Sequence, residues 1–380
     1  MPTIIATCPE ELTGLLASEL DRLGATRIEP GHRVVEADLS LEQIYRSLLV
    51  LRTASRVLLP LGSVAAGSGP ILYDQVCGIP WPELFDGRMP YSLEIHDGGG
   101  RGRRVDPIAA TRLIEQALEE SFRKAGGPTP RLRPDRPKVI ISVFLRDDFC
   151  RLSLDLSGRS QHKRGYRLDG HPGPLKETLA AAVLSFAGYD GSQLLFDPMC
   201  GSGTLVIEGA FVALDKAPLI HRKKGQFGVE WLRGPWDPKR WRLVQDEARQ
   251  TRRTQPAQPI IGSDINPDFI DLTRRCALRA RVEKHLDLRV NDFFEADPPA
   301  ESGLLVSNIP YGERVATPDR TLEEFYREIG RTLKQRYQGW TVALLVAEES
   351  PHRLIDLPPR QSVSLRNGGV PVCLLIFDPQ

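Results

Sequence analysis

Five strongly apolar runs alternate with helical segments in the second half of the chain, and this alternation limits the fold more than any other feature. The runs are "QLLFD" (193–197), "PIIGSD" (259–264), "LDLRV" (286–290), "LLVSN" (304–308) and "VALLV" (342–346). Strands this apolar are buried on both faces, as in a parallel sheet covered by helices. The last segment, "QSVSLRNGGVPVCLLIFD", instead predicts an antiparallel hairpin that turns at Asn367, Gly368 and Gly369. We therefore expect residues 175–380 to form a doubly wound α/β domain closed by an antiparallel last strand.

The residues before this domain predict smaller α+β modules. Residues 1–62 are expected to run strand, helix, strand, helix, with Gly24 ending the first helix. A second module is expected over residues 63–158. Its predicted elements are a helix near 71–85, a strand at 91–95, a helix over 107–124, and two strands that turn at Asp147 and Asp148. Residues 159–174, rich in Gly, Pro and basic side chains, are expected to be a linker.

The composition is that of an ordinary globular protein, with 41% hydrophobic residues and 33 glycines. The start, "MPTIIATCPEEL", lacks the basic region of a secretory signal, and no apolar run approaches the roughly 20 residues that span a bilayer. Six well-separated cysteines without a C-x-x-C pair favour neither a disulfide framework nor a zinc site. We expect a cytoplasmic protein with no membrane and no metal partner.

Positive charge is concentrated in one stretch, although the net charge of the chain is only +1. Residues 1–100 contain 7 Lys and Arg against 13 Asp and Glu, whereas residues 101–170 contain 16 against 9. Such asymmetry is typical of a surface that binds nucleic acid. The candidate phosphate contacts are Arg101, Arg103, Arg104, Arg159, Lys163, Arg164 and Arg167. A solvated loop and an ordinary linker are the alternatives for these positions.

The stretch "LLFDPMCGSGT" ends a predicted strand at Asp197 and reaches Gly201 and Gly203 just before a predicted helix. Glycines let the backbone approach a ligand closely, and a helix N-terminus attracts negative charge. Position 206 is Val, so the spacing is not that of the dinucleotide fingerprint and a nicotinamide cofactor is disfavoured. A structural turn is the alternative.

Acidic residues follow the next two predicted strands. Asp264 ends "IIGSD", and its carboxylate suits the two hydroxyls of a ribose because it accepts from both donors. Asp292, in "VNDFF", suits the amine of an adenine, with Phe293 against a ring face. A helix cap for Asp264 and a plain turn for Asp292 are the alternatives.

The fourth strand ends in "SNIPYGER" (307–314), which does not favour strand continuation. The side-chain oxygen of Asn308 and the backbone carbonyl of Ile309 are candidate acceptors for the N–H groups of an exocyclic base amine. Two such acceptors orient the lone pair of the amine toward an electrophilic methyl group. Pro310 fixes the turn, and Tyr311 offers a ring on which a flipped base stacks. An ordinary turn after a core strand is the alternative.

These four polar signals fall at four successive strand ends, on one edge of the predicted sheet. Open α/β sheets bind their ligands at this edge. Together the signals predict a pocket for S-adenosylmethionine beside a site for a base amine.

These motifs and most of the remaining chain resemble the bacterial THUMP-containing guanine-N2 methyltransferases of 23S ribosomal RNA. The matching stretches are "DPMCGSGT", "SNIPYGER", "ATCPEELTGLLASELDRLGA", "YRSLLVLRTASRVLLPLG", "LDLSGRSQHKRGYR" and "PLKETLAAAVL". The resemblance implies a ferredoxin-like element over residues 1–62 and a THUMP domain over 63–158, which bind RNA. It also implies a class I (Rossmann-like) methyltransferase domain over 175–380 that methylates the N2 amine of a guanine in 23S ribosomal RNA.

Residue by residue, the resemblance implies that the target base contacts Asn308, Ile309, Pro310 and Tyr311, with Arg314 among the RNA contacts. The implied S-adenosylmethionine residues are Lys176, Glu177, Asp197, Pro198, Met199, Cys200, Gly201, Gly203, Thr204, Asp264, Ile265, Asp292 and Phe293.

One position departs from the family pattern, because Ile309 stands where proline is usual. The acceptor there is a backbone carbonyl, so we expect activity to survive this change, which adds an N–H group and a β-branched side chain. Some bacterial members carry a fused second methyltransferase. This chain ends directly after its last predicted strand, so we do not expect that activity in it.

Three other functions remain open. A transfer-RNA guanine-N2 methyltransferase shares both modules, and only the N-terminal resemblance favours ribosomal RNA over it. A DNA adenine-N6 methyltransferase shares the tetrapeptide at 308–311 but not the THUMP-like region. The intact Asn308, Tyr311 and 197–204 loop disfavour a non-catalytic RNA-binding protein.

Overall fold

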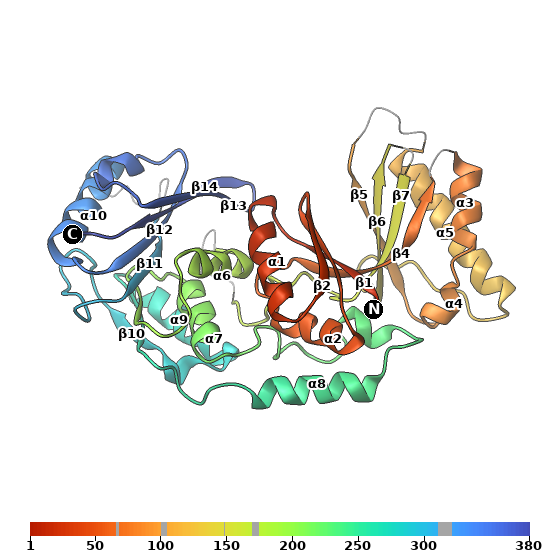
Figure 1. The fold of residues 1–380 in the computed structure, drawn as a ribbon, viewed down its shortest axis with the longest axis horizontal. Helices are drawn as coiled ribbons and strands as arrows, with labels where there is room; N and C mark the ends of the chain where they lie inside the picture. Colours follow the sequence, from red (N-terminus) through yellow and green to blue (C-terminus); the bar gives the residue numbers. More distant parts are fainter. Residues whose placement is uncertain (66–67, 100–104, 148, 169–174, 311–320) are drawn as a thin grey trace. The chain divides into compact units, whose positions relative to one another are not determined.

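The computed structural model describes residues 1–65, 68–99, 105–147, 149–168, 175–310 and 321–380. These residues form two compact units, each built on its own seven-stranded sheet (Figure 1). The first unit contains Met1–Leu49, Ala54–Gln161 and Arg222–Asp246. The second unit contains Val50–Thr53, His162–His221 and Glu247–Gln380.

The sheet of the first unit has the strand order β2-β3-β1-β4-β7-β6-β5. Its strands are β1 (Thr3–Thr7), β2 (Thr26–Gly31), β3 (Val34–Asp38), β4 (Arg56–Ala65), β5 (Tyr91–Asp97), β6 (Val139–Arg146) and β7 (Phe149–Asp155). Neighbouring strands are antiparallel except β5 and β6, which are parallel. Because β4 pairs with β1 on one side and β7 on the other, the two predicted N-terminal modules share one continuous sheet.

The helices of this region are α1 (Thr13–Arg22), α2 (Leu41–Val50), α3 (Gly69–Cys77), α4 (Trp81–Leu84) and α5 (Pro107–Lys124), with a short 3-10 helix η1 (Glu10–Leu12). The start of α5 is fixed by Asp106, whose side chain accepts from the backbone N–H groups of Ile108 and Ala109. α3 and α5 lie side by side, and their apolar faces form one core with the inner faces of β6 and β7 (Figure 1).

Two local predictions for this unit were wrong. The helix expected near 71–85 is two helices, because Gly78 and Pro80 interrupt it between α3 and α4. The strand β2 was not predicted. Its residues are almost all exposed and include Pro30 and Gly31, so it shows no alternation of apolar and polar side chains.

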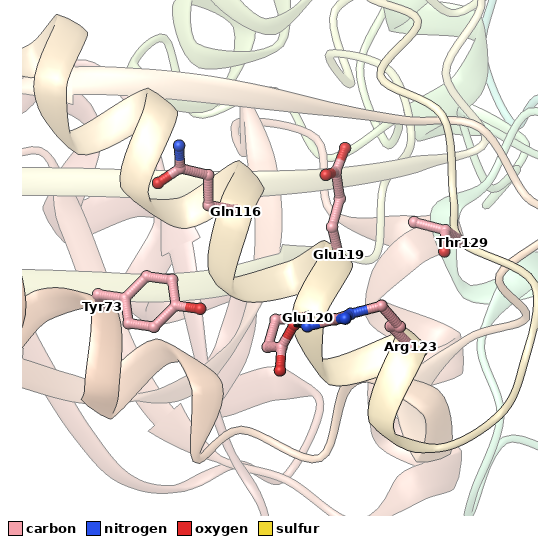
Figure 2. Close-up of a pocket in the computed structure, with 6 residues that line it drawn as sticks. All are labelled: Tyr73, Gln116, Glu119, Glu120, Arg123 and Thr129. Carbon is pink, nitrogen blue, oxygen red and sulfur yellow. Dashed lines mark hydrogen bonds and ion pairs between the residues drawn. The ribbon is translucent and has the colours of Figure 1, made fainter.

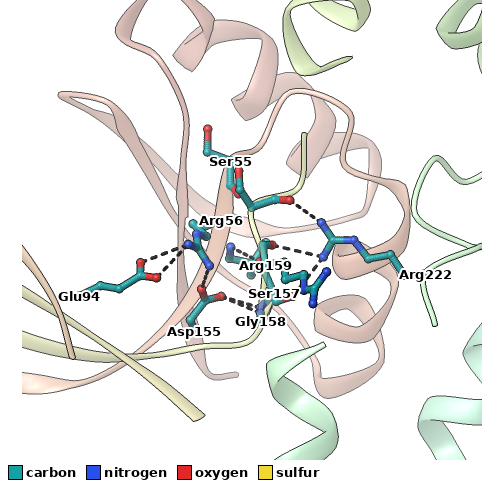
Figure 3. Close-up of polar contacts among 10 residues, drawn as sticks. Ser55, Arg56, Glu94, Asp155, Ser157, Gly158, Arg159 and Arg222 are labelled. Carbon is teal, nitrogen blue, oxygen red and sulfur yellow. Dashed lines mark hydrogen bonds and ion pairs between the residues drawn. The ribbon is translucent and has the colours of Figure 1, made fainter. Parts of the chain in front are cut away.

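Residues 222–246 belong to the first unit although they are far from its other parts in sequence. Arg222 is buried, and its guanidinium donates to the carbonyl oxygens of Ser157, Arg159 and Ser160 (Figure 3). The same region contains an ion pair between Arg56 and the buried Asp155. Arg222 therefore satisfies three loop carbonyls and fastens the segment that follows it, which contains η2 (Gly228–Trp231) and the start of α8 (Pro238–Gln250).

The sheet of the second unit has the order β10-β9-β8-β11-β12-β14-β13. Its strands are β8 (Leu195–Asp197), β9 (Ile260–Asp264), β10 (Asp287–Val290), β11 (Leu304–Asn308), β12 (Thr341–Ala347), β13 (Gln361–Asn367) and β14 (Val370–Phe377). The first five strands in the sheet order are mutually parallel, and β14 is antiparallel to both β12 and β13. This topology confirms the predicted parallel sheet closed by an antiparallel hairpin.

The helices of the second unit are α6 (Glu177–Phe186), α7 (Thr204–Ala213), α9 (Pro267–Ala280) and α10 (Leu322–Arg336), with 3-10 helices η3 (Glu283–His285) and η5 (His352–Ile355). One of its cores packs α10 against β11, β12 and β14, around the buried aromatic rings of Tyr326, Tyr337 and Trp340. In the part of the chain that the structure describes, no helix is long and apolar enough to cross a membrane.

Candidate active site

The candidate site lies at the carboxyl ends of β8, β9 and β11, where three predicted residues end their strands. Asp197 ends β8, Asp264 ends β9 and Asn308 ends β11, as the sequence predicted. In the sheet, β8 lies between β9 and β11, and the chain order reverses there. Ligands of open α/β sheets bind at such a switch point.

The loop from Pro198 to Gly203 connects β8 to α7 and depends on two glycines in left-handed conformations. Gly201 has φ of 55° and Gly203 has φ of 75°. A Cβ atom on Gly203 would also lie 2.4 Å from Cγ2 of Thr273, so no larger residue fits there without a shift. The hydroxyl of Thr273 donates to the carbonyl oxygen of Gly201 over 2.8 Å. Thr273, which the sequence reading missed, thus holds the loop from α9.

Asp264 fastens the same loop from β9. Its Oδ2 accepts from the backbone N–H of Gly201 over 2.9 Å, and its Oδ1 accepts from that of Asn266 over 3.0 Å. Asn266, not Asp264, caps α9, because its side chain accepts from the N–H of Asp268. The helix-cap alternative for Asp264 was therefore wrong. Ile265, beside it, is 67% exposed.

Asp197 is buried and binds two donors through one oxygen. Its Oδ1 accepts from the hydroxyl of Ser307 over 2.7 Å and from the backbone N–H of Met199 over 3.2 Å. Burial raises the pKa of Asp197 to about 7, against the opposing effect of these two hydrogen bonds. Ser307, a residue of β11, is a second residue that the sequence reading missed.

The side chains of Asn308 and Ile309, at the end of β11, differ in their contacts. The Oδ1 atom of Asn308 is buried and has no hydrogen-bond partner among the residues that the structure describes. Ile309 is 1% exposed, its side chain packs in the core under α10, and its N–H donates to the carbonyl oxygen of Leu345 over 2.9 Å. Pro310 follows and is half-buried.

The predicted residues after β10 are organised as a turn. Asp292 accepts from the backbone N–H of Phe294 over 2.8 Å, as a plain turn aspartate does. The Phe293 ring is buried in the core, 5.6 Å from the ring of Tyr337. Phe293 is 5% exposed, and its predicted contact with a ligand ring stays a prediction.

Arg167 and the residues at the start of α6 form a polar cluster near the first residue of α7. Glu177 is buried and pairs with Arg167 over 3.1 Å, whereas Lys176 is exposed. A second guanidinium nitrogen of Arg167 lies 3.5 Å from the hydroxyl of Thr204, the first residue of α7. Its Nη1 atom is buried and has no hydrogen-bond partner among the described residues. The Arg167 side chain therefore faces the start of α7 and not a phosphate-binding surface.

The predicted RNA contacts have different outcomes. Arg101, Arg103, Arg104, Tyr311 and Arg314 lie outside the described residues, and Lys163 is exposed. Arg164 is 2% exposed and pairs with Glu208 over 3.4 Å, so its predicted contact with phosphate is corrected. The physical reason is that the buried Glu208 requires a cation beside it.

A hollow of about 420 Å³ lies elsewhere, in the first unit, between α3 and α5 (Figure 2). Its lining residues are Tyr73, Gln116, Glu119, Glu120, Arg123 and Thr129. Arg123 pairs with Glu120, so the lining has no spare positive charge to attract a phosphate. None of the predicted site residues lines it.

A parallel sheet of this order with an antiparallel strand after β12, and polar side chains at its switch point, defines a class I methyltransferase domain. Residues 164–375 match the family described as RMKL-like, methyltransferase domain, and residues 3–58 match the RlmL ferredoxin-like domain. The chain therefore belongs to the RMKL-like methyltransferase family.

Known proteins share this organisation. The chain is 36% identical to a ribosomal RNA large subunit methyltransferase K/L of Methylococcus capsulatus, over 98% of this chain and 50% of the relative. It is 30% identical to a putative RNA methyltransferase of Synechocystis, over 98% of this chain and 96% of the relative. The crystal structure of SMU.472, a putative methyltransferase complexed with SAH, aligns with a TM-score of 0.87 at 24% identity and covers 100% of this chain and 98% of its own. The chain spans about half the length of the curated K/L relatives it matches.

Proposed function

We propose that this protein is an S-adenosylmethionine-dependent methyltransferase that modifies the exocyclic N2 amine of a guanine in 23S ribosomal RNA, in the cytoplasm. Membership of the family supports methyl transfer, and relatives named for the large-subunit ribosomal RNA support this RNA as the substrate. We also propose that the region over 63–158 is a THUMP domain that binds the RNA.

The proposal depends on the buried Oδ1 of Asn308, which has no hydrogen-bond partner among the residues that the structure describes. A buried acceptor without a donor costs roughly 1–3 kcal/mol, so such an atom is retained where a ligand supplies the donor. An amine N–H of a guanine is a donor of the right kind. Asn308 would accept one N–H and the carbonyl of Ile309 the other, which leaves the amine lone pair free to point at a methyl group.

The residues around the glycine loop fit S-adenosylmethionine. The buried Nη1 of Arg167 has a donor to offer to the carboxylate of a methionine moiety, and the carboxylate oxygens of Asp264 have lone pairs left to accept from ribose hydroxyls. When bound, this cofactor supplies an electrophilic methyl group on a sulfonium. The chain itself holds the amine and orients it.

The proposal is tested by incubating the protein and labelled S-adenosylmethionine with separate pools of unmodified 23S, 16S and transfer RNA. The modified nucleoside is then identified after digestion. We expect N2-methylguanosine in the 23S pool alone. The same nucleoside in transfer RNA alone would instead assign the protein to the transfer-RNA enzymes, and binding of RNA without any methyl transfer would contradict catalysis.

A further inference from the structure

Ser307 and Asp197 form a side-chain hydrogen bond that crosses between two strands at the candidate site. The hydroxyl of Ser307 lies 2.7 Å from Oδ1 of Asp197. Ser307 is 0% exposed and Asp197 is 1% exposed, so water does not compete for this bond. The residue after Ser307 is Asn308, and the residues after Asp197 form the glycine loop.

This bond lies where the backbone ladder between the two strands has ended. β8 and β11 pair only through Leu195 with Leu304 and through Phe196 with Leu305. Beyond these pairs, Asp197 remains paired with β9, opposite Gly262. Backbone pairing between the two strands therefore ends at the switch point, where open α/β sheets place their ligand crevice.

The other edge of β11 remains fully paired at the same level. Asn308 is in register with Leu345 of β12, and the N–H of Ile309 extends the ladder by one more bond. On the β8 side of the site, Asp197 also accepts a hydrogen bond from the backbone N–H of Met199, which belongs to the glycine loop. At this level, Asn308 is thus held by pairing with β12, whereas Asp197 is held by pairing with β9 and by the glycine loop. Beyond the last backbone pair of β8 and β11, the hydrogen bond from the Ser307 hydroxyl to Asp197 connects the strand that carries Asn308 to the strand that precedes the glycine loop.

We propose that Ser307 is a positioning residue for methyl transfer, whose hydroxyl fixes the separation between Asn308 and the glycine loop by holding Asp197. This inference rests on the proposed function, because it assigns the loop to the methyl donor and Asn308 to the acceptor amine. Reactions between two bound groups are sensitive to their alignment, and a displacement of about 1 Å lowers the rate by roughly a hundredfold.

A positioning role differs from a purely structural one in what it changes. Without the Ser307 hydroxyl, Asn308 keeps its pairing with β12 and Asp197 keeps its pairing with β9, so binding of the cofactor and of RNA should persist. The alignment of the two bound groups should be lost, so the fall should appear in kcat and not in KM.

The test compares Ser307→Ala with wild type, with Ser307→Thr, which retains the hydroxyl, and with Ser47→Ala. Ser47 is a matched control because it is also 0% exposed, and among the described residues its hydroxyl donates to the carbonyl oxygen of Ile44 in its own helix over 2.7 Å. For each protein, kcat and KM for RNA and the Kd of S-adenosylhomocysteine are measured per folded molecule. Hydrogen exchange of the peptide covering 304–309 is measured in the ligand-free protein.

We expect Ser307→Ala to lower kcat at least tenfold, whereas KM for RNA and the Kd of S-adenosylhomocysteine stay within threefold of wild type. The backbone amides of residues 304–309 should exchange several-fold faster in this variant than in wild type. Ser307→Thr should have a higher kcat than Ser307→Ala. Ser47→Ala should change neither kcat nor the exchange rate of the 304–309 amides. The proposal requires both the kcat loss and the faster exchange, and it is overturned if either is missing in Ser307→Ala. If wild type itself methylates no RNA, the proposed function fails, and the exchange comparison still tests the bond.

Discussion

The backbone N–H of Ile309 donates a 2.9 Å hydrogen bond to the carbonyl oxygen of Leu345, one residue beyond the last register pair of β11 and β12. Proline, the residue usual in the resembling family, has no N–H to make this bond. The Ile309 side chain is buried in the core under α10. The departure at this position therefore adds a ladder bond and core packing, and it leaves the carbonyl of Ile309 in place.

We predict that Ile309→Pro lowers the free energy of unfolding by about 1–3 kcal/mol, because a ladder bond and buried methyl groups are lost. Methyl transfer should stay within tenfold of wild type, since the carbonyl acceptor is retained. Urea unfolding and steady-state rates measure the two effects. Ile309→Val, which keeps the N–H and loses one methylene, is the control and should cost about 0.5–1.5 kcal/mol. Equal stability of the proline and valine variants would contradict the role of the bond.

The contact between Gly203 and Thr273 gives a second prediction. Gly203→Ala places a Cβ 2.4 Å from Cγ2 of Thr273 and strains a residue with φ of 75°. We expect the Kd of S-adenosylhomocysteine to rise at least tenfold, because the loop must shift. Adding Thr273→Ser removes the Cγ2 methyl and should recover part of that affinity. Isothermal titration of the single and double variants measures this, and no recovery would show that backbone strain alone explains the loss.

The strand ends could be predicted from the sequence, whereas the residues that hold them could not. Asp197, Asp264 and Asn308 follow apolar runs, so the change of composition marks the end of each strand. Ser307 and Thr273 are small polar residues inside a strand and a helix, and their partners are 110 and 72 residues away in sequence. Arg164 and Arg167 lie in one basic stretch, yet each pairs with a buried glutamate that only the folded chain brings near.

Arg167 gives a third prediction, about the cofactor. If its buried Nη1 binds the carboxylate of the methionine moiety, Arg167→Gln should raise the Kd of S-adenosylhomocysteine at least tenfold. The Kd of 5′-methylthioadenosine, which lacks that carboxylate, should stay within threefold. Equal losses for both ligands would mean that the variant disturbs the whole pocket, for example by leaving Glu177 buried without its cation.

Asp197 gives a prediction about pH. Burial raises its pKa from 3.8 to about 7; the bonds from Ser307 and Met199 oppose the rise, and the nearby Asp264 adds to it. The folded protein therefore holds a proton that the unfolded chain releases, so this contribution to stability is fully present below pH 3.8 and is lost as the pH rises through about 7. Asp197→Asn, which cannot ionise, should flatten the decline of the unfolding free energy across this window. Urea unfolding at several pH values measures it, and parallel curves for the two proteins would contradict it.

The buried oxygen of Asn308, which has no partner within the described part of the chain, is assigned to the target amine, and one comparison tests this assignment directly. Methyl transfer to RNA and the Kd of S-adenosylhomocysteine are measured for wild type and Asn308→Ala. The account predicts that the variant loses at least a hundredfold in transfer, as typical for removal of a preorganised hydrogen-bonding group, while its cofactor affinity stays within threefold. Transfer at the wild-type rate, or an equal loss of transfer and cofactor affinity, would contradict the assignment of Asn308 to the target amine.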